Sequence, residues 1–164
     1  MELYIIRHAW AEQRDDEQWP DDGERPLTKA GRQRFARVVE QLALRGVAPE
    51  VVATSPLARC VETTQVLVDG LDEMPEVVQL DELLPGSDLQ GLIEFTAGQI
   101  DRAGSVAWVG HAPDVSLLTA ELIGGAGGWI RFAKGSVAAI RFLGLPAAGN
   151  GELRWLATAK VLGC

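Results

Sequence analysis

The segment Glu2-Leu3-Tyr4-Ile5-Ile6-Arg7-His8 places a run of apolar residues directly before an arginine and a histidine. Bulky aromatic and β-branched side chains favour strands, and a short apolar run of this kind is typical of a strand buried within a sheet. We therefore predict a buried strand over residues 2–6. Arg7 and His8 then stand at its carboxyl end, where the chain leaves the sheet.

Outward from this segment, strand-like and helix-like stretches alternate along the chain. Helical periodicity is clearest after Thr28, a residue suited to an N-cap, and it continues up to Gly46. The predicted strands cover residues 51–54, 77–80, 106–109, 136–143 and 152–158, and the predicted helices cover residues 28–46, 56–68, 88–102 and 113–123. Two further segments are predicted loops, the acidic residues 12–25 and the glycine-rich residues 124–128.

Strands that alternate with helices predict a layered α/β/α domain with a mostly parallel central sheet. A turn rich in Pro, Gly and Asn joins the last two strands, so these are predicted to form an antiparallel hairpin at the sheet edge. The sequence shows no internal repeat and no stretch with the composition of an interdomain linker, and a length of 164 residues suits one hydrophobic core. We therefore expect a single domain over residues 1–164.

Composition limits the partners. Hydrophobic residues make up 47% of the chain and the net charge is −8, which is typical of a globular protein and disfavours binding to nucleic acid or anionic membranes. No apolar run approaches the roughly 20 residues needed to span a bilayer, and the N-terminus lacks the pattern of a signal peptide. Cys60 and Cys164 lie far apart, which fits a reducing compartment. We expect a cytoplasmic protein.

The two histidines of the chain and two of its arginines follow predicted strands. Arg7 and His8 end the first strand, and His111 directly follows a later one. Arg59 lies in the first turn of the helix after the second strand. Because ligands bind at the carboxyl ends of parallel strands, we expect these four side chains to surround one site.

Two arginines and two histidines around one site suit a phosphoryl group. The guanidinium fork matches phosphate oxygens, and a neutral imidazole is a competent nucleophile toward phosphorus. Nearby guanidinium charges lower the pKa of such an imidazole, and a second imidazole can donate hydrogen bonds to the phosphoryl oxygens. The pattern therefore predicts phosphoryl transfer through a phosphohistidine that needs no metal.

Two other interpretations of these residues compete with this one. Taken singly, an arginine at a strand end is most often solvated and a lone histidine is most often structural or exposed, so only the joint placement indicates a function. Histidine is also a common metal ligand. The chain contains no His-x-x-x-His, no His-x-His and no cysteine cluster, which disfavours a metal site.

Four segments resemble, in the same order, the motifs of the histidine phosphatase superfamily. Residues 5–9 (Ile-Ile-Arg-His-Ala) resemble its Arg-His-Gly signature, and residues 24–28 with Gly31 resemble the stretch before its first long helix. Residues 55–63 resemble its Ser-Pro-x-x-Arg-x-x-x-Thr segment, and residues 109–111 resemble the late strand that carries its second histidine. The matches run from residue 2 to about residue 120, and the short chain most resembles the SixA-type phosphohistidine phosphatases.

The resemblance implies the histidine phosphatase/phosphoglycerate mutase-like fold and a phosphatase without cofactor or metal. It implies that His8 accepts the phosphoryl group and that Arg7, Arg59 and His111 form the phosphate pocket. Arg25, from the loop match, is implied to face the same pocket. One departure is Ala9, which replaces the glycine of the signature and disfavours only a left-handed backbone there.

The resemblance leaves the leaving-group acid and the substrate open. Many members use a carboxyl to protonate the leaving group, and Glu82 lies near the equivalent segment, although a solvated or capping acid fits it equally well. A phosphohistidine needs less acid help, because imidazole is a good leaving group. Cys60 is predicted to be a small buried helix residue, with oxidative modulation of the site as the alternative.

Three functions are consistent with these residues. The absence of long insertions favours an open site and a phosphohistidine phosphatase that acts on a partner protein. The first alternative is a phosphatase or phosphomutase for small phosphate esters, with the same fold and Glu82 as a working acid. The second is a non-catalytic module that binds phosphate or a phosphopeptide.

Overall fold

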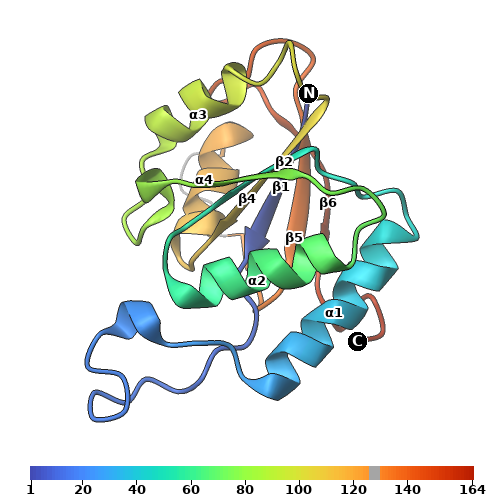
Figure 1. Cartoon of the computed structure of the whole chain (residues 1–164). Coiled ribbons are helices and arrows are strands. Elements are labelled where there is room, and N and C mark those ends of the chain that lie inside the picture. Colours follow the sequence, from blue (N-terminus) through green and yellow to red (C-terminus); the bar gives the residue numbers. More distant parts are fainter. Residues whose placement is uncertain (126–129) are drawn as a thin grey trace.

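The computed structural model describes residues 1–125 and 130–164, and in this part of the chain a single six-stranded sheet forms the centre (Figure 1). The strand order is β3-β2-β4-β1-β5-β6. The strands are β1 (Glu2–Arg7), β2 (Val51–Thr54), β3 (Glu76–Gln79), β4 (Ser105–Gly110), β5 (Val137–Arg141) and β6 (Glu152–Ala157). The first four run parallel, whereas β5 is antiparallel to both β1 and β6. The mostly parallel sheet with an antiparallel hairpin at its edge confirms the prediction.

Helices cover both faces of this sheet (Figure 1). The helices are α1 (Lys29–Ala43), α2 (Ala58–Asp69), α3 (Leu89–Ala97) and α4 (Asp114–Leu122), and the 3-10 turns are η1 (Asp22–Glu24) and η2 (Asp81–Leu83). Buried side chains of α1 and α2 pack against one face, and those of α3 and α4 pack against the other. The predicted α/β/α layering is therefore present. Within the described residues, no helix is both long and apolar enough to cross a membrane.

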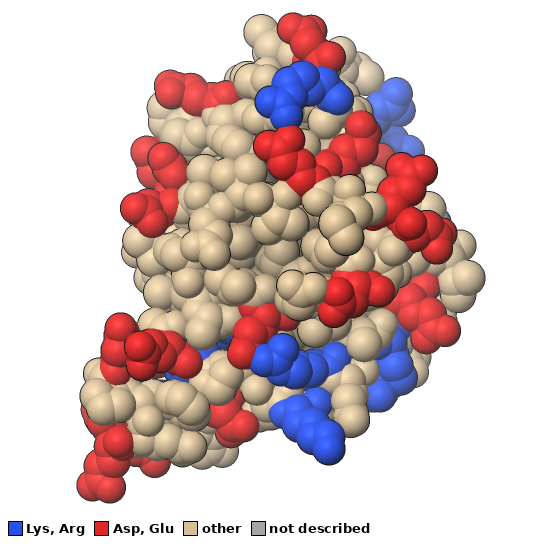
Figure 2. All heavy atoms as spheres, in the orientation of Figure 1, with Lys and Arg blue, Asp and Glu red and all other residues tan. Residues whose placement is uncertain are grey.

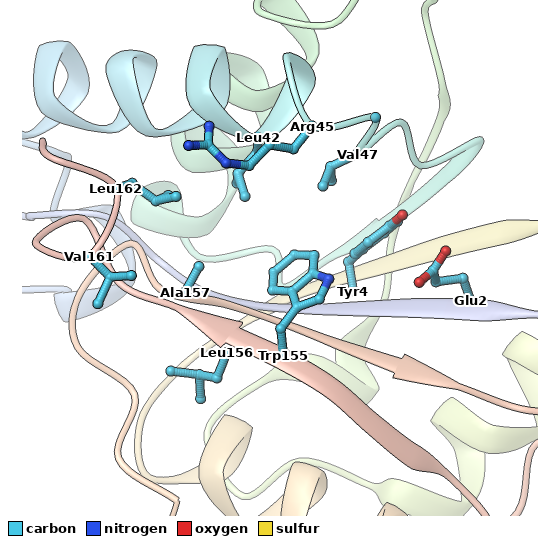
Figure 3. A pocket seen from close by; sticks show the side chains of 11 residues that line it. Glu2, Tyr4, Leu42, Arg45, Val47, Trp155, Leu156, Ala157, Val161 and Leu162 are labelled. Atoms are coloured by element: carbon cyan, nitrogen blue, oxygen red, sulfur yellow. The ribbon is translucent and has the colours of Figure 1, made fainter.

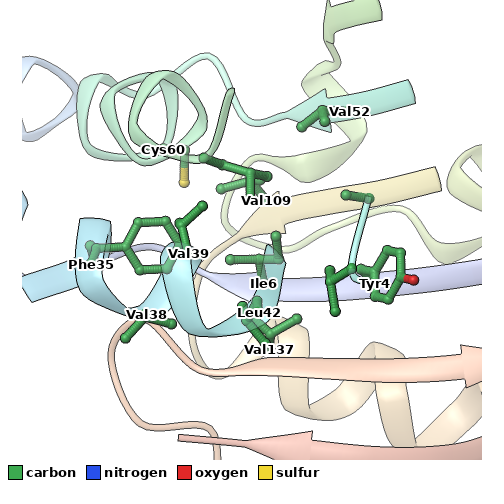
Figure 4. Packing of buried hydrophobic residues seen from close by; sticks show 14 of the residues in the cluster. Tyr4, Ile6, Phe35, Val38, Val39, Leu42, Val52, Cys60, Val109 and Val137 are labelled. Carbon is green, nitrogen blue, oxygen red and sulfur yellow. The ribbon is translucent and has the colours of Figure 1, made fainter. Parts of the chain in front are cut away.

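Alternation along β1 separates the two cores. Tyr4 and Ile6 pack in the core under α1 and α2, and Leu3 and Ile5 pack in the core under α3 and α4. All four are at most 4% exposed. Figure 4 shows the first of these cores, where Phe35 and its neighbours on α1 meet the sheet. Because successive side chains point to opposite faces, a strand covered on both sides is apolar throughout, which confirms the buried strand predicted here.

The start of α1 fixes the chain that leaves β1. Thr28 Oγ1 accepts a hydrogen bond from Gly31 N at 2.8 Å and donates one to Trp10 O at 3.2 Å. A Cβ atom at Gly31 would lie 2.2 Å from that same Trp10 oxygen, so only glycine permits this approach. The segment directly after His8 is therefore held against the first turn of α1.

Some predicted boundaries are wrong. The helix predicted to reach residue 102 ends at Ala97, because the amides of Gln99 and Ile100 bond three residues back instead of four and close tight turns. The predicted loop 12–25 includes the η1 turn, in which Asp21 accepts a hydrogen bond from Gly23 N. Of the predicted loop 124–128, residues 126–128 lie outside the described residues.

Candidate active site

The carboxyl ends of two neighbouring strands bring the histidines together. β1 and β4 are paired with Arg7 opposite Gly110, and His8 N donates to Gly110 O at 2.9 Å. As a result, the ring centroids of His8 and His111 lie 5.4 Å apart. Arg59 joins them from the first turn of α2.

These four side chains line one cavity of about 380 Å³. Arg25 lines it too, so the structure brings together every residue singled out for the phosphate pocket. Asp114 and Lys134 also line the cavity, and sequence reasoning missed both. The remaining lining residues are Pro85, Gly86, Ala112 and Pro113.

His8 is held in one tautomer. Its Nδ1 lies 2.8 Å from Ala9 O, and a carbonyl oxygen only accepts hydrogen bonds. Nδ1 therefore carries the proton in the neutral ring, which leaves the lone pair on Nε2. Burial lowers the pKa of His8 to about 3, against the opposing effect of the Ala9 hydrogen bond, and the charges of His111, Arg59 and Arg7 lower it further. The predicted effect of the guanidinium charges is present, but burial is the larger cause.

His111 is buried and neutral as well. Its Nε2 lies 2.9 Å from Ser55 Oγ and 3.5 Å from Cys60 Sγ. Burial, followed by the charge of Arg59, lowers the pKa of His111 to about 4. Cys60 is fully buried in α2, and burial raises the pKa of its thiol to about 12, so it packs against the imidazole as a neutral thiol. This agrees with its prediction as a small buried helix residue.

Asp22 orients two of the arginines. Arg59 donates through Nη1 to Asp22 O at 2.9 Å, and the same nitrogen lies 3.2 Å from Asp22 Oδ2. Arg25 donates through Nε to Asp22 Oδ1 at 2.8 Å, and this bond is the largest cause of the lowered pKa of Asp22. Arg7, the third arginine of the cavity, donates through Nη1 to Phe132 O at 2.8 Å. The three guanidiniums are thus fixed before any ligand arrives, which favours binding of a phosphoryl group.

Thr63 joins the first strand to the second helix. Its Oγ1 accepts a hydrogen bond from Ala9 N at 3.0 Å and donates one to Arg59 O at 2.6 Å. One hydroxyl therefore ties the residue after His8 to the backbone of Arg59. No residue other than glycine has a positive φ among those described, so Ala9 at the signature glycine position is unstrained.

The structure does not bring Glu82 to the cavity. Glu82 lies in η2, where its Cγ sits against Gly91 of α3, and it is not one of the lining residues. The carboxyl that reaches the cavity belongs to Asp114, whose Oδ2 accepts a hydrogen bond from Gly86 N at 3.0 Å. Asp114 follows His111 by three residues, and an acid in the first turn of a helix usually indicates only a favourable interaction with the helix dipole.

A second cavity of about 360 Å³ lies between the end of α1, β6 and the segment that follows it (Figure 3). Its lining is mostly apolar, with Tyr4 and Trp155 near its centre, and Glu2 and Arg45 are the charged residues in it. The described lining contains no histidine and no cysteine. The two cavities are similar in volume, so the reactive side chains of the lining identify the cavity around His8 as the candidate active site.

Comparison with known proteins identifies the family. The sequence model of the histidine phosphatase superfamily (branch 1) matches residues 3–123. The chain belongs to this superfamily. An uncharacterized protein of Picosynechococcus sp. (strain ATCC 27264 / PCC 7002 / PR-6) is 34% identical over 117 residues, which are 70% of this chain and 68% of that protein. All four motif segments noted in the sequence fall inside the matched residues.

Solved structures of phosphatases have a similar fold. The protein histidine phosphatase SixA complexed with tungstate has a TM-score of 0.86 and 26% identity to this histidine phosphatase family member, and the match covers 99% of each chain. The alpha-ribazole phosphatase from Shigella flexneri has a TM-score of 0.65 and 19% identity over 97% of each chain. At that identity, the second similarity shows the fold alone.

Proposed function

We propose that this chain is a metal-independent phosphatase that hydrolyses phosphohistidine in a partner protein through a covalent intermediate on His8. The observation that carries the proposal is the hydrogen bond from His8 Nδ1 to Ala9 O. It leaves the Nε2 lone pair available in a cavity lined by Arg7, Arg59 and His111.

The proposed reaction has two displacements at phosphorus. The substrate ring takes a proton from solvent on its free nitrogen. His8 Nε2 then forms a bond to phosphorus while the bond from phosphorus to the substrate imidazole breaks, and the substrate ring leaves as neutral imidazole; hydrolysis in the second step returns one proton to solvent. Water then attacks the phosphoryl group on His8, which releases inorganic phosphate and restores the neutral histidine. Arg7 and Arg59 balance the charge on the phosphoryl oxygens in both steps, and His111 hydrogen-bonds to them.

Two observations support a phosphohistidine substrate. SixA, the more similar of the two solved structures described above, is a protein histidine phosphatase and was obtained with tungstate, a tetrahedral oxyanion like phosphate. In addition, the carboxyl predicted as an acid, Glu82, lies away from the cavity, and a leaving imidazole has little need of one.

A phosphate-ester substrate is the second candidate, because one carboxyl does line the cavity. Asp114 lies on the same loop-to-helix segment as His111 and could protonate an alkoxide leaving group. This candidate uses the same nucleophile and the same arginines, and differs only in the need for an acid.

The test is turnover of a carrier protein that bears phosphohistidine, followed as released phosphate, with His8→Ala as the control. We expect release by the wild type, unchanged by EDTA, and none above background by the variant. Rapid acid-free quenching should also trap phosphate on the wild-type chain and not on His8→Ala. Turnover that persists in His8→Ala would contradict the mechanism, and turnover of esters alone would favour the second candidate.

A further inference from the structure

A third hollow, of about 490 Å³, lies beside the active-site cavity and shares Lys134 with it. Its cationic lining residues are Arg34, Arg131, Lys134 and Lys160, and we refer to these four as the basic cleft. Trp10 and Thr158 also line it, and its described lining contains neither Asp nor Glu. None of the roles proposed above for the cavity uses Arg34, Arg131 or Lys160.

Within the described part of the chain, no Asp or Glu side chain pairs with a residue of the basic cleft. Six arginines elsewhere form ion pairs with side-chain carboxylates, but none of the four cleft residues does. This is unexpected in a chain with 23 acidic and 15 basic residues. Figure 2 shows Asp and Glu spread widely over one face of the molecule, with Lys and Arg grouped in its lower middle, over the first part of α1, and again near its top. The positive potential of the cleft is therefore available to a ligand.

Part of the basic cleft is preorganised. The Arg34 guanidinium carbon lies 4.3 Å from the centroid of a Trp10 ring, and Arg34 Nη2 donates to Cys164 O at 3.0 Å. Stacking and the hydrogen bond fix this cation on α1. Trp10, which lines the cleft, follows His8 by only two residues, so the cleft adjoins the nucleophile along the chain.

The spread of the cations indicates the kind of ligand. They come from three separate segments, namely α1, the stretch before β5 and the stretch after β6, and Arg131 and Lys160 are exposed. Four charges spread around a hollow of this size suit several carboxylates along a polypeptide better than one compact anion. Charges of this type at the rim of an interface steer association and select partners.

We propose that the basic cleft binds an acidic segment of the protein substrate that flanks its phosphorylated histidine, an inference that rests on the function proposed above. The phosphoryl group would enter the cavity past Lys134 while neighbouring Asp or Glu residues contact Arg34, Arg131 and Lys160. The cleft would then select among phosphohistidine proteins by the charge around the modified residue.

The experiment compares two synthetic peptides with the same central phosphohistidine, one flanked by glutamates and the other by glutamines. The test variant is Arg131→Glu/Lys160→Glu. The matched control is Arg37→Glu/Arg141→Glu. It makes the same charge change at two exposed positions that line neither the active-site cavity nor the hollow of the basic cleft. We expect the wild type and the control to favour the acidic peptide by about tenfold in kcat/KM at low salt, and the test variant to lose this preference.

Phosphoramidate, a small probe without flanking residues, should be hydrolysed equally by all three proteins, because neither Arg131 nor Lys160 lines the cavity. A preference that survives in Arg131→Glu/Lys160→Glu, or an equal loss with both peptides, would overturn the inference and leave the proposed function intact.

If the wild type hydrolyses neither peptide, the proposed function fails, and binding then decides the role of the cleft. Fluorescence anisotropy of the labelled glutamate peptide without phosphate should show about tenfold weaker binding to the test variant than to the control. Equal binding by the two variants would overturn the inference about the cleft.

Discussion

His8 acts as a nucleophile only while Nε2 keeps its lone pair, and two features of the site protect that lone pair. The Ala9 carbonyl holds the proton of the neutral ring on Nδ1. Burial lowers the pKa of His8 to about 3 and that of His111 to about 4. Both imidazoles are therefore neutral when the arginines around them are charged, which is the combination that phosphoryl transfer to nitrogen requires.

The charge state of each histidine can be measured directly by NMR, because the chain has only two histidines. We expect the side-chain NMR resonances of His8 and His111 to show no titration between pH 5.5 and 8, since both folded-state pKa values lie below this range. The variants His8→Asn and His111→Asn assign the two signals. A titration midpoint near 6.5, the ordinary histidine value, in either signal would contradict the effect of burial.

Single substitutions also identify the carboxyl that protonates the leaving group. We expect Asp114→Asn to slow hydrolysis of a phosphate ester by about 10²-fold or more, with a much smaller effect on a phosphohistidine peptide, because solvent can protonate the imidazole beforehand, whereas an alkoxide needs a proton donor as it leaves. Glu82→Gln is the matched control and should be close to wild type with both substrates, since Glu82 does not line the cavity. The reverse order of effects would return the acid role to Glu82.

Sequence reasoning found the residues at strand ends, and the family resemblance added Arg25 from a loop, but neither indicated Asp114 or Lys134. Arg7, His8 and His111 follow apolar strands, so the topology of a parallel sheet alone brings them together. Asp114 and Lys134 give no such signal, because their approach to the cavity depends on how distant loops fold. Gly86, for example, donates to Asp114 across 28 residues of sequence. Glu82 lies near the family segment that carries the acid, but in the structure the η2 turn places its side chain against α3.

Among the elements, β1 and α2 must keep a fixed spacing for the site to exist, and Thr63 connects them. We expect Thr63→Val to lower stability by about 1–3 kcal/mol, because it leaves Ala9 N, a buried donor, without its partner. We also expect kcat/KM to fall, because the ends of the two elements that carry His8 and Arg59 lose their common hydrogen-bond partner.

Thr119→Val in α4 provides the matched control for this change. Thr119 is fully buried and its Oγ1 donates to the carbonyl four residues earlier, as that of Thr63 does, but no backbone amide of another described element donates to it. Urea unfolding and kcat/KM measured on both variants separate the two effects. A Thr63→Val enzyme with a kcat/KM equal to that of the control would contradict a positioning role for Thr63.

The elements were predictable to the extent that burial imposes a period on the sequence. β1 is a continuous apolar run because both of its faces contact a core, and α1 repeats apolar residues at helical spacing because one of its faces does. The end of α3 depends on backbone hydrogen bonds that carry no such period, so its predicted length was wrong. The register shift between β5 and β6 near Ala139 and Ile140 is equally invisible, because both strands keep strand-like residues around it.

For the whole molecule, two buried neutral histidines make stability depend on pH. In the unfolded chain a histidine has a pKa of about 6.5, whereas His8 and His111, which are 8% and 4% exposed, have folded-state pKa values of about 3 and about 4. At a pH between the folded-state and unfolded-state pKa values, the histidines of the unfolded chain bind protons that those of the folded chain do not. Stability from this source is therefore complete above about pH 6.5 and declines as the pH falls, by about 1.4 kcal/mol per pH unit for each histidine.

Urea unfolding between pH 7 and pH 5 measures this decline, and a variant without the histidines isolates it. We expect the free energy of unfolding of the wild type to fall more steeply with decreasing pH than that of His8→Asn/His111→Asn. The 23 acidic residues contribute equally to both proteins, so the difference between the two slopes belongs to the imidazoles. Parallel slopes would mean that the site tolerates charged histidines, and then neither the fixed tautomer of His8 nor its neutrality at working pH could support the proposed attack on phosphorus.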